Sequence, residues 1–222
     1  MVNGFDFYID YVLCIDGSFG MKGAPIDSAK EYATTLFEET KAFLVESGFN
    51  IGRFRIKVIV FRDYAFDGKP MEESRFFTLC GGDVDDTAEY LAFVNGIEAK
   101  GGGEKSNGFE ALALAFRSDW SKNFTLHRRI VQIISNREYL PLQARKDCDG
   151  YPVDMPADLE GLRDLYEKCG RKARLFVFGP EFESNMILWE WPNTVWDLHY
   201  NMGQLTELDR ACFNNLSYVA DY

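Results

Sequence analysis

The sequence contains little of what metal centres and disulfide frameworks are usually built from. Its two histidines, His127 and His199, lie far apart with no partner at the spacing of zinc ligands, so a zinc site is not expected. The five cysteines are odd in number, widely scattered and never paired as Cys-x-x-Cys. We therefore predict reduced thiols, at least two of them buried, and no disulfide framework.

Basic residues are outnumbered, and long apolar runs are missing. The chain has 24 Lys and Arg against 35 Asp and Glu, a net charge of −11, which opposes binding to nucleic acid or to an anionic membrane. No window approaches the roughly 20 uninterrupted apolar residues of a membrane span. The first ten residues, MVNGFDFYID, have neither a basic start nor the apolar core of a signal peptide. A soluble, cytoplasmic protein is expected.

The composition nevertheless suffices for one large hydrophobic core. Of 222 residues, 46% are apolar and 15% are aromatic, which excludes a disordered or fibrous chain. The sequence shows no internal repeat, no low-complexity tract and no break wide enough for a second domain. We expect a single domain over residues 1–222.

Segments with strand and helix periodicity alternate along the chain. Strands are predicted at 8–15, 53–61, 75–79, 129–134, 173–178 and 194–198. Helices are predicted around 25–47, 84–95, 109–116, 159–169, 186–189 and 205–216, and a long polar loop at 141–156. The alternation predicts an α/β fold, with a doubly wound, mainly parallel sheet, helices on both faces and the short segment 75–79 as an antiparallel edge strand.

Three polar clusters follow predicted strands or enter a predicted helix. They are Asp-Gly-Ser-Phe-Gly at 16–20, Gly-Gly-Gly-Glu-Lys-Ser at 101–106 and Ser-Asn at 135–136. Ligands bind where the carboxyl ends of parallel strands meet, at one edge of the sheet. An aspartate and hydroxyls from separate loops could hold one side of a hard divalent cation such as Mg²⁺.

In these loops the sequence resembles the von Willebrand factor A (VWA) domain family. Members carry Asp-x-Ser-x-Ser after the first strand, as part of a metal-ion-dependent adhesion site. Asp16 and Ser18 match this motif, whereas Gly20 stands in place of its last serine. Phe-Arg-Asp-Tyr at 61–64, and the segments at 140–142 and 154–156, are similar to an intracellular bacterial branch of the family. The resemblance therefore extends over nearly the whole chain.

The resemblance implies a Mg²⁺ site at the carboxyl edge of the sheet. Its expected ligands are Asp16, Ser18, Ser106 from the glycine-rich second loop, and Asn136 in the place of a third carboxylate. Because Gly20 and Asn136 supply less than the family pattern does, Mg²⁺ is expected to be weakly held or absent. Gly20→Ser combined with Asn136→Asp is expected to tighten Mg²⁺ binding.

The resemblance also implies a non-enzymatic module that binds another protein at this edge. The partner would offer a carboxylate to the cation, and Phe19 and Gly20 would contact it. One alternative is a VWA-like structural subunit with a decayed metal site, which binds through its helix faces. Another is a phosphohydrolase with an aspartate nucleophile, although Ser18 stands where this chemistry needs a second acid.

Ordinary structural roles would also explain these residues. Asp16 and Ser18 could form a hydrogen-bonded turn. Either Ser106 or Asn107 could cap the following helix, and Asn136 could be a turn former. These roles remain open at the level of the sequence.

Two further groups are predicted to be structural. A local ion pair or turn contact is expected for Arg62 and Asp63. Core packing or helix-sheet packing is expected for the three tryptophans at 189, 191 and 196.

Overall fold

The structure of the chain is a computed structural model that describes residues 6–122, 126–170 and 173–197. The predicted helix at 205–216, His199 and Cys212 lie outside these residues. The described strands are β1 (Asp6–Asp16), β2 (Asn50–Phe61), β3 (Met71–Glu73), β4 (Phe77–Cys80), β5 (His127–Ile134), β6 (Ala173–Phe178) and β7 (Thr194–Asp197). The described helices are α1 (Ala24–Glu46), α2 (Thr87–Asn95), α3 (Gly108–Phe116), α4 (Leu159–Lys168) and α5 (Glu183–Trp189), with a 3₁₀ turn η1 at Phe19–Met21.

Strand β1 lies in the middle of the sheet, whose order is β3-β2-β1-β5-β6-β7, with β4 also paired to β2. It pairs in parallel with β2 on one side and with β5 on the other, and β6 and β7 continue in parallel. The chain therefore continues from β1 to β2 on one side and later, after α3, places β5 on the other side of β1. Such a reversal is where open parallel sheets leave a crevice for ligands, and it lies at the carboxyl end of β1.

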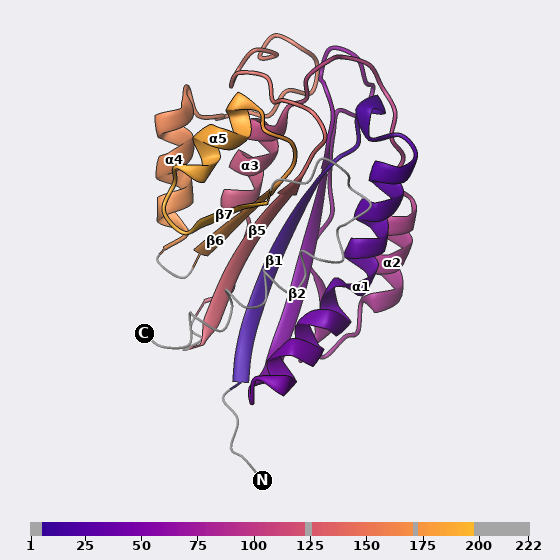
Figure 1. Cartoon of the computed structure of the whole chain (residues 1–222), viewed down its shortest axis with the longest axis vertical. Coiled ribbons are helices and arrows are strands. Elements are labelled where there is room, and N and C mark those ends of the chain that lie inside the picture. Colours follow the sequence, from indigo (N-terminus) through magenta and orange to yellow (C-terminus); the bar gives the residue numbers. More distant parts are fainter. Residues whose placement is uncertain (1–5, 123–125, 171–172, 198–222) are drawn as a thin grey trace.

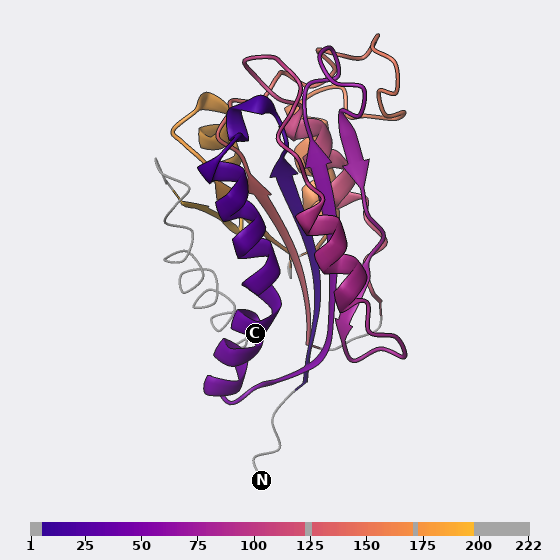
Figure 2. The same ribbon diagram turned by 90° about the vertical axis from the view of Figure 1, so that its right-hand side faces the viewer.

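The helices cover both faces of the sheet (Figures 1 and 2). Helices α1 and α2 lie on one face, and α3, α4 and α5 lie on the other. Strand β1 is an almost unbroken apolar run because it is buried on both faces. Its alternate side chains divide between two cores: Leu13 packs with Leu36 of α1, whereas Val12 packs with Leu112 of α3.

The predicted fold class is confirmed, with one addition at the sheet edge. The predicted edge segment 75–79 corresponds to β4, which pairs antiparallel with β2. A second antiparallel strand, β3, precedes it and also pairs with β2. It was not predicted, because three residues are too few for a periodic pattern.

Two further observations concern the described part of the chain. Its four cysteines are free thiols, of which Cys14 and Cys169 are buried. None of its helices combines the length and the apolar character needed to cross a bilayer.

Candidate binding site at the carboxyl end of the sheet

Asp16 is the last residue of β1 and is completely buried. Its Oδ1 accepts a hydrogen bond from the backbone N–H of Ser18 at 2.8 Å. Its Oδ2 accepts from the hydroxyls of Ser135 at 2.6 Å and Ser106 at 3.2 Å. Burial raises the pKa of Asp16 above its ordinary value, and these hydrogen bonds offset part of the rise. One carboxylate thus joins the loops that follow β1, follow β5 and precede α3.

Ser18 and Ser106, two of the predicted ligands, meet at this carboxylate from separate loops. Ser18 is 2% exposed, and its side chain lies beside the Asp16 carboxylate, where it offsets part of the rise that burial causes in the pKa of that group. Ser106 is held by backbone bonds to the loop after β5, because its N–H donates to Glu138 O and its carbonyl accepts from Leu140 N–H. The turn contact considered for the first loop is present, as the Ser18 N–H bond to Asp16 shows.

Asn107 is the N-cap residue of α3, as one of the two expected candidates, but it does not cap the helix through its side chain. Its Oδ1 instead accepts from the backbone N–H of Tyr64 at 3.2 Å. Asn107 therefore ties the start of α3 to the loop after β2.

The third loop brings Ser135, and not Asn136, to the carboxylate. Ser135 is fully buried, donates to Asp16 Oδ2 and accepts from the backbone N–H of Arg137 at 2.9 Å. Asn136 is half-buried, and no described residue hydrogen-bonds to its side chain. Ser135 was not among the predicted site residues. A hydroxyl residue directly after a buried strand was the signal that pointed to it.

Phe19 and Gly20 form the outer part of the first loop, within the 3₁₀ turn. Phe19 is 53% exposed, and the Lys22 ammonium lies 5.1 Å from the centroid of its ring. Gly20 is covered by Arg137: a Cβ on residue 20 would lie 2.6 Å from Cζ and 2.8 Å from Cδ of that arginine. Arg137 therefore fills the space that a side chain at position 20 would need.

Arg62 holds the base of these loops and is 2% exposed. Its guanidinium donates to the carbonyls of Gly17, Lys69 and Glu98, each at 2.9 Å. It also donates to the Glu72 carboxylate at 2.7 Å. All three guanidinium nitrogens of Arg62 are thus hydrogen-bonded. A buried arginine bound in this way holds the loops together.

Asp63 forms its ion pair elsewhere. It does not pair with Arg62, but accepts two hydrogen bonds from Arg145, at 2.7 and 2.9 Å. It also accepts from the backbone N–H of Ala65, which is the predicted turn contact. The Arg145 pair fixes the polar loop at 141–156 to the end of β2, a long-range contact that local sequence patterns do not show.

Mg²⁺ takes six oxygen ligands in octahedral geometry, usually with one or two carboxylates among them. The donor set at the end of β1 offers one carboxylate, whose two oxygens already accept hydrogen bonds, and the hydroxyls of Ser18 and Ser106. Across the described residues, no three or more His, Cys, Asp or Glu side chains gather as a metal site. The side chain of Arg137 occupies the space beside Gly20 that the last serine of the motif would need. With Arg137 in this position, the residues do not fit a Mg²⁺ ion.

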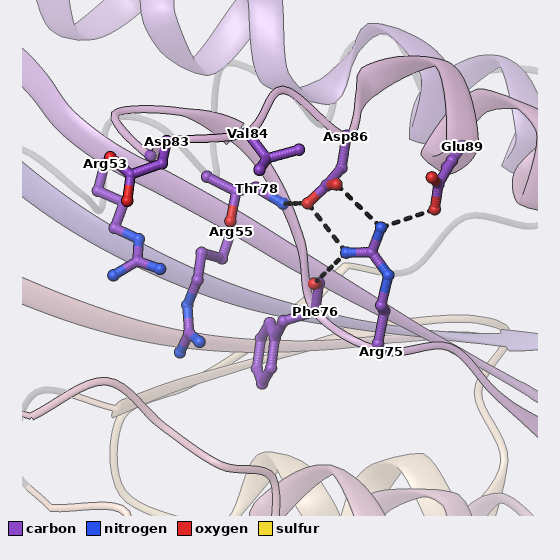
Figure 3. Close-up of a pocket in the computed structure, with 10 residues that line it drawn as sticks. Arg53, Arg55, Arg75, Phe76, Thr78, Asp83, Val84, Asp86 and Glu89 are labelled. Atoms are coloured by element: carbon purple, nitrogen blue, oxygen red, sulfur yellow. Dashed lines mark hydrogen bonds and ion pairs between the residues drawn. The ribbon is translucent and has the colours of Figure 1, made fainter.

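A cavity of about 570 Å³ lies away from this site, beside β2, β4 and the loop before α2 (Figure 3). Arg75 on its wall donates to Asp86 and Glu89, at 2.9 and 2.6 Å. Arg55 pairs with Asp10 at 2.8 Å. Arg75 and Arg55 are thus paired within the protein, whereas the buried Nε of Arg53, which lines the same cavity, has no hydrogen-bond partner among the described residues.

The described tryptophans differ in their surroundings. Trp191 is buried in the core beside Tyr166, as predicted. Trp189 is 58% exposed, with its ring 6.1 Å from that of Trp196. Trp189 at the end of α5 therefore packs on Trp196 of β7, which is the helix-sheet contact that was the other expectation for these residues.

Comparison with known proteins gives matches in structure and not in sequence. No family model matches the sequence, and no curated protein matches it. Among solved structures, the pilus adhesin SpaC from Lactobacillus rhamnosus GG is similar with a TM-score of 0.60 and 8% identity, over 96% of this chain and 31% of that one. A von Willebrand factor type A protein from Catenulispora acidiphila is similar with a TM-score of 0.56 and 14% identity, over 95% of this chain and 43% of that one.

The present chain spans less than half of the length of either neighbour. At these identities, the likeness is one of architecture. It agrees with the central β1, the parallel neighbours on both sides and the helix layers on both faces. The chain has the von Willebrand factor type A fold.

Proposed function

We propose that the chain is a non-enzymatic protein-interaction module whose partner binds at the carboxyl edge of the sheet. The observation that carries the proposal is a set of large apolar side chains exposed on the loops of this edge. Phe19, Phe66 and Val153 are 53%, 56% and 80% exposed. They belong to three loops, after β1, after β2 and between β5 and α4. Exposed apolar groups beside polar ones are typical of interaction surfaces.

The loops that carry these side chains are held in place by buried polar contacts. Asp16 joins the first loop to two others. Arg62 clamps the base of the loops, and the Asp63–Arg145 pair fixes the loop that contains Val153. A surface that is ordered before binding loses less conformational entropy when a partner binds. This supports recognition at the edge.

The surroundings of Asp16 argue against its use as a nucleophile. An attacking carboxylate must present an oxygen to its substrate. Asp16 is completely buried and both its oxygens accept hydrogen bonds. Residue 18, where a phosphohydrolase of this kind needs an acid, is serine. One of the similar solved structures is by its name an adhesin, which also supports a binding role.

Co-purification with matched variants tests the proposal. The tagged wild-type chain and three single variants would be purified from the native host, and bound proteins quantified by mass spectrometry. Phe19→Ala alters the carboxyl edge. Trp189→Ala alters a helix face, and Val45→Ala alters the opposite end of α1, where the side chain is 59% exposed. All three remove one exposed apolar side chain.

We expect a specific partner to be depleted by Phe19→Ala and retained by the other two variants. Chemical crosslinks from that partner should fall on the loops after β1 and β2. Loss with Trp189→Ala alone would instead support binding through helix faces. Crosslinks confined to the amino-end edge of the sheet would refute the proposal.

A further inference from the structure

Arg137 and Lys100 differ from the other buried or half-buried cations at the carboxyl edge, because neither forms an ion pair with a described residue. Arg62 pairs with Glu72, and Lys105 pairs with Glu138. Arg145 pairs with Asp63 (Arg145 Nε to Asp63 Oδ1, 2.7 Å). Arg137 is half-buried, and no carboxylate of the described residues lies within ion-pair distance of it. Its Nε is buried and has no hydrogen-bond partner in the described part of the chain.

The position of Arg137 is fixed from two directions. Its backbone N–H donates to Ser135 Oγ, and this hydroxyl donates to Asp16. Its guanidinium lies against the backbone of Gly20, where the absence of a side chain leaves room for it. The Ser18 side chain, two residues before Gly20, is buried beside the Asp16 carboxylate. The site therefore combines a cation that lies against Gly20 with a buried hydroxyl.

We infer that Arg137 is the cation of this site and binds a carboxylate of the partner directly, in the place where a metal ion would otherwise mediate the contact. The inference rests on the proposed function for the identity of the partner as a protein. The guanidinium carries a fixed positive charge and a planar fork of N–H donors that matches a carboxylate. Exposed Phe19, adjacent to Gly20 in the same turn, adds apolar contact beside the charged group.

The cation also explains the incomplete metal site. An ion of charge +2 beside a guanidinium would experience like-charge repulsion in a partly desolvated site. Asp16, the one carboxylate below, already accepts three hydrogen bonds and forms no ion pair with Arg137. Glycine at position 20 and the Arg137 side chain packed against it therefore belong to one arrangement.

An NMR titration of the arginine Nε–Hε groups tests the inference without the partner. Sodium acetate is the probe, at constant ionic strength and in EDTA, with sodium chloride as the reference salt. The Nε–Hε signal of Arg137, assigned from its absence in Arg137→Gln, is compared with that of exposed Arg163, which pairs with Glu167. Arg137→Lys keeps the charge and removes the fork. The melting temperature of each variant shows that it is folded.

We expect acetate to shift the Arg137 signal saturably, with little effect on Arg163. In a competition assay with a fluorescent acidic peptide selected on the wild type in EDTA, Arg137→Lys should bind about tenfold more weakly, and Arg137→Gln more weakly still. If acetate does not shift the Arg137 Nε–Hε signal saturably, the inference is wrong. It is also wrong if inorganic phosphate shifts this signal and acetate does not. These outcomes do not depend on where the native partner binds, so they are separate from a failure of the proposed function.

Discussion

The guanidinium of Arg137 lies against Gly20, in the space where the last serine of an Asp-x-Ser-x-Ser motif would place its side chain. The two positions are 117 residues apart in the sequence, and each alone is unremarkable. Together they change the chemistry at the end of β1, because a potential oxygen ligand is missing and a fixed positive charge takes its space. The first prediction concerns the consequence for metal binding.

Mg²⁺ binding should depend on removing Arg137 as well as restoring the missing oxygens. A Cβ at position 20 would lie 2.6 Å from Arg137 Cζ, so Gly20→Ser with Asn136→Asp should gain little affinity while the arginine is present. Adding Arg137→Ala should tighten binding by at least about tenfold relative to that double variant. Isothermal titration with Mg²⁺ measures both. If the double variant binds as tightly as the triple one, Arg137 does not hold the position described.

Asp16→Ala should destabilise the fold by about 1–3 kcal/mol, because it leaves buried donors without an acceptor. The donors are the hydroxyls of Ser135 and Ser106 and the N–H of Ser18. Urea unfolding gives the free energy. Asn136→Ala changes the loop after β5, and the Asn136 side chain makes no hydrogen bond to the described residues, so this variant should stay within about 0.5 kcal/mol of wild type. Equal effects of the two changes would contradict the role given to Asp16.

The contribution of Asp16 to the free energy of unfolding should fall as pH rises, which is the reverse of the usual behaviour of a carboxylate. Burial raises its pKa above the ordinary value of 3.8, so the folded state binds the proton more tightly than the unfolded state. The contribution of Asp16 to the free energy of unfolding should therefore be greatest below pH 3.8 and fall as pH rises to the folded pKa. Subtracting the profile of Asp16→Asn from that of wild type isolates this contribution. A difference that rises with pH over this window would be inconsistent with a raised pKa.

Asp10, in the first half of β1, should make the free energy of unfolding depend on pH in the opposite direction. Its burial raises the pKa, but hydrogen bonds from His127, Arg55 and the backbone of Ser121 outweigh this and hold the pKa well below 3.8. Its contribution to stability is therefore present above pH 3.8 and is lost as pH falls below that value. Asp10→Asn should cost about 3–5 kcal/mol at neutral pH, because it breaks a buried ion pair. Chemical denaturation at a series of pH values tests this, and an Asn variant as stable as wild type at neutral pH would refute it.

Arg62→Met should loosen the candidate site without altering its surface. The change removes donors to the carbonyls of Gly17 and Glu98 and to the Glu72 carboxylate, and should cost about 3–5 kcal/mol. Amide hydrogen exchange should accelerate in the loops at 17–20 and 98–103. Arg163→Met serves as the control, since Arg163 is an exposed helical partner of Glu167 and its loss should change stability little. Unchanged exchange in both loops would show that Arg62 is not the clamp.

The sequence predicted the features that depend on long regular patterns. The buried run of β1, the stripe of α1 and the position of Asp16 after a strand could all be predicted, because burial on both faces imposes a continuous apolar segment. The features that it missed depend on contacts between distant segments. Ser135 hydrogen-bonds to Asp16 across the sheet, and Arg137 fills the space above Gly20. A hydroxyl residue directly after a buried strand is the one local signal for Ser135, and no periodic or local signal indicates the contact of Arg137 with Gly20.

The ion pairs at the carboxyl edge also depend on contacts between distant segments, which the sequence does not show. Arg62 and Asp63 are neighbours in sequence, and a local pair was the natural expectation. In the structure they pair with different partners, Arg62 with Glu72 and Asp63 with Arg145. Successive residues at the end of a strand point to opposite sides, so they contact different loops.

The most direct test is the affinity of the co-purified partner for the wild type and for Arg137→Gln, each measured with Mg²⁺ and with EDTA. If Arg137 supplies the positive charge, EDTA should leave the wild-type affinity unchanged, whereas Arg137→Gln should weaken binding by at least about tenfold under both conditions. Loss of wild-type binding in EDTA, with Arg137→Gln binding normally in Mg²⁺, would show instead that a metal ion mediates the contact.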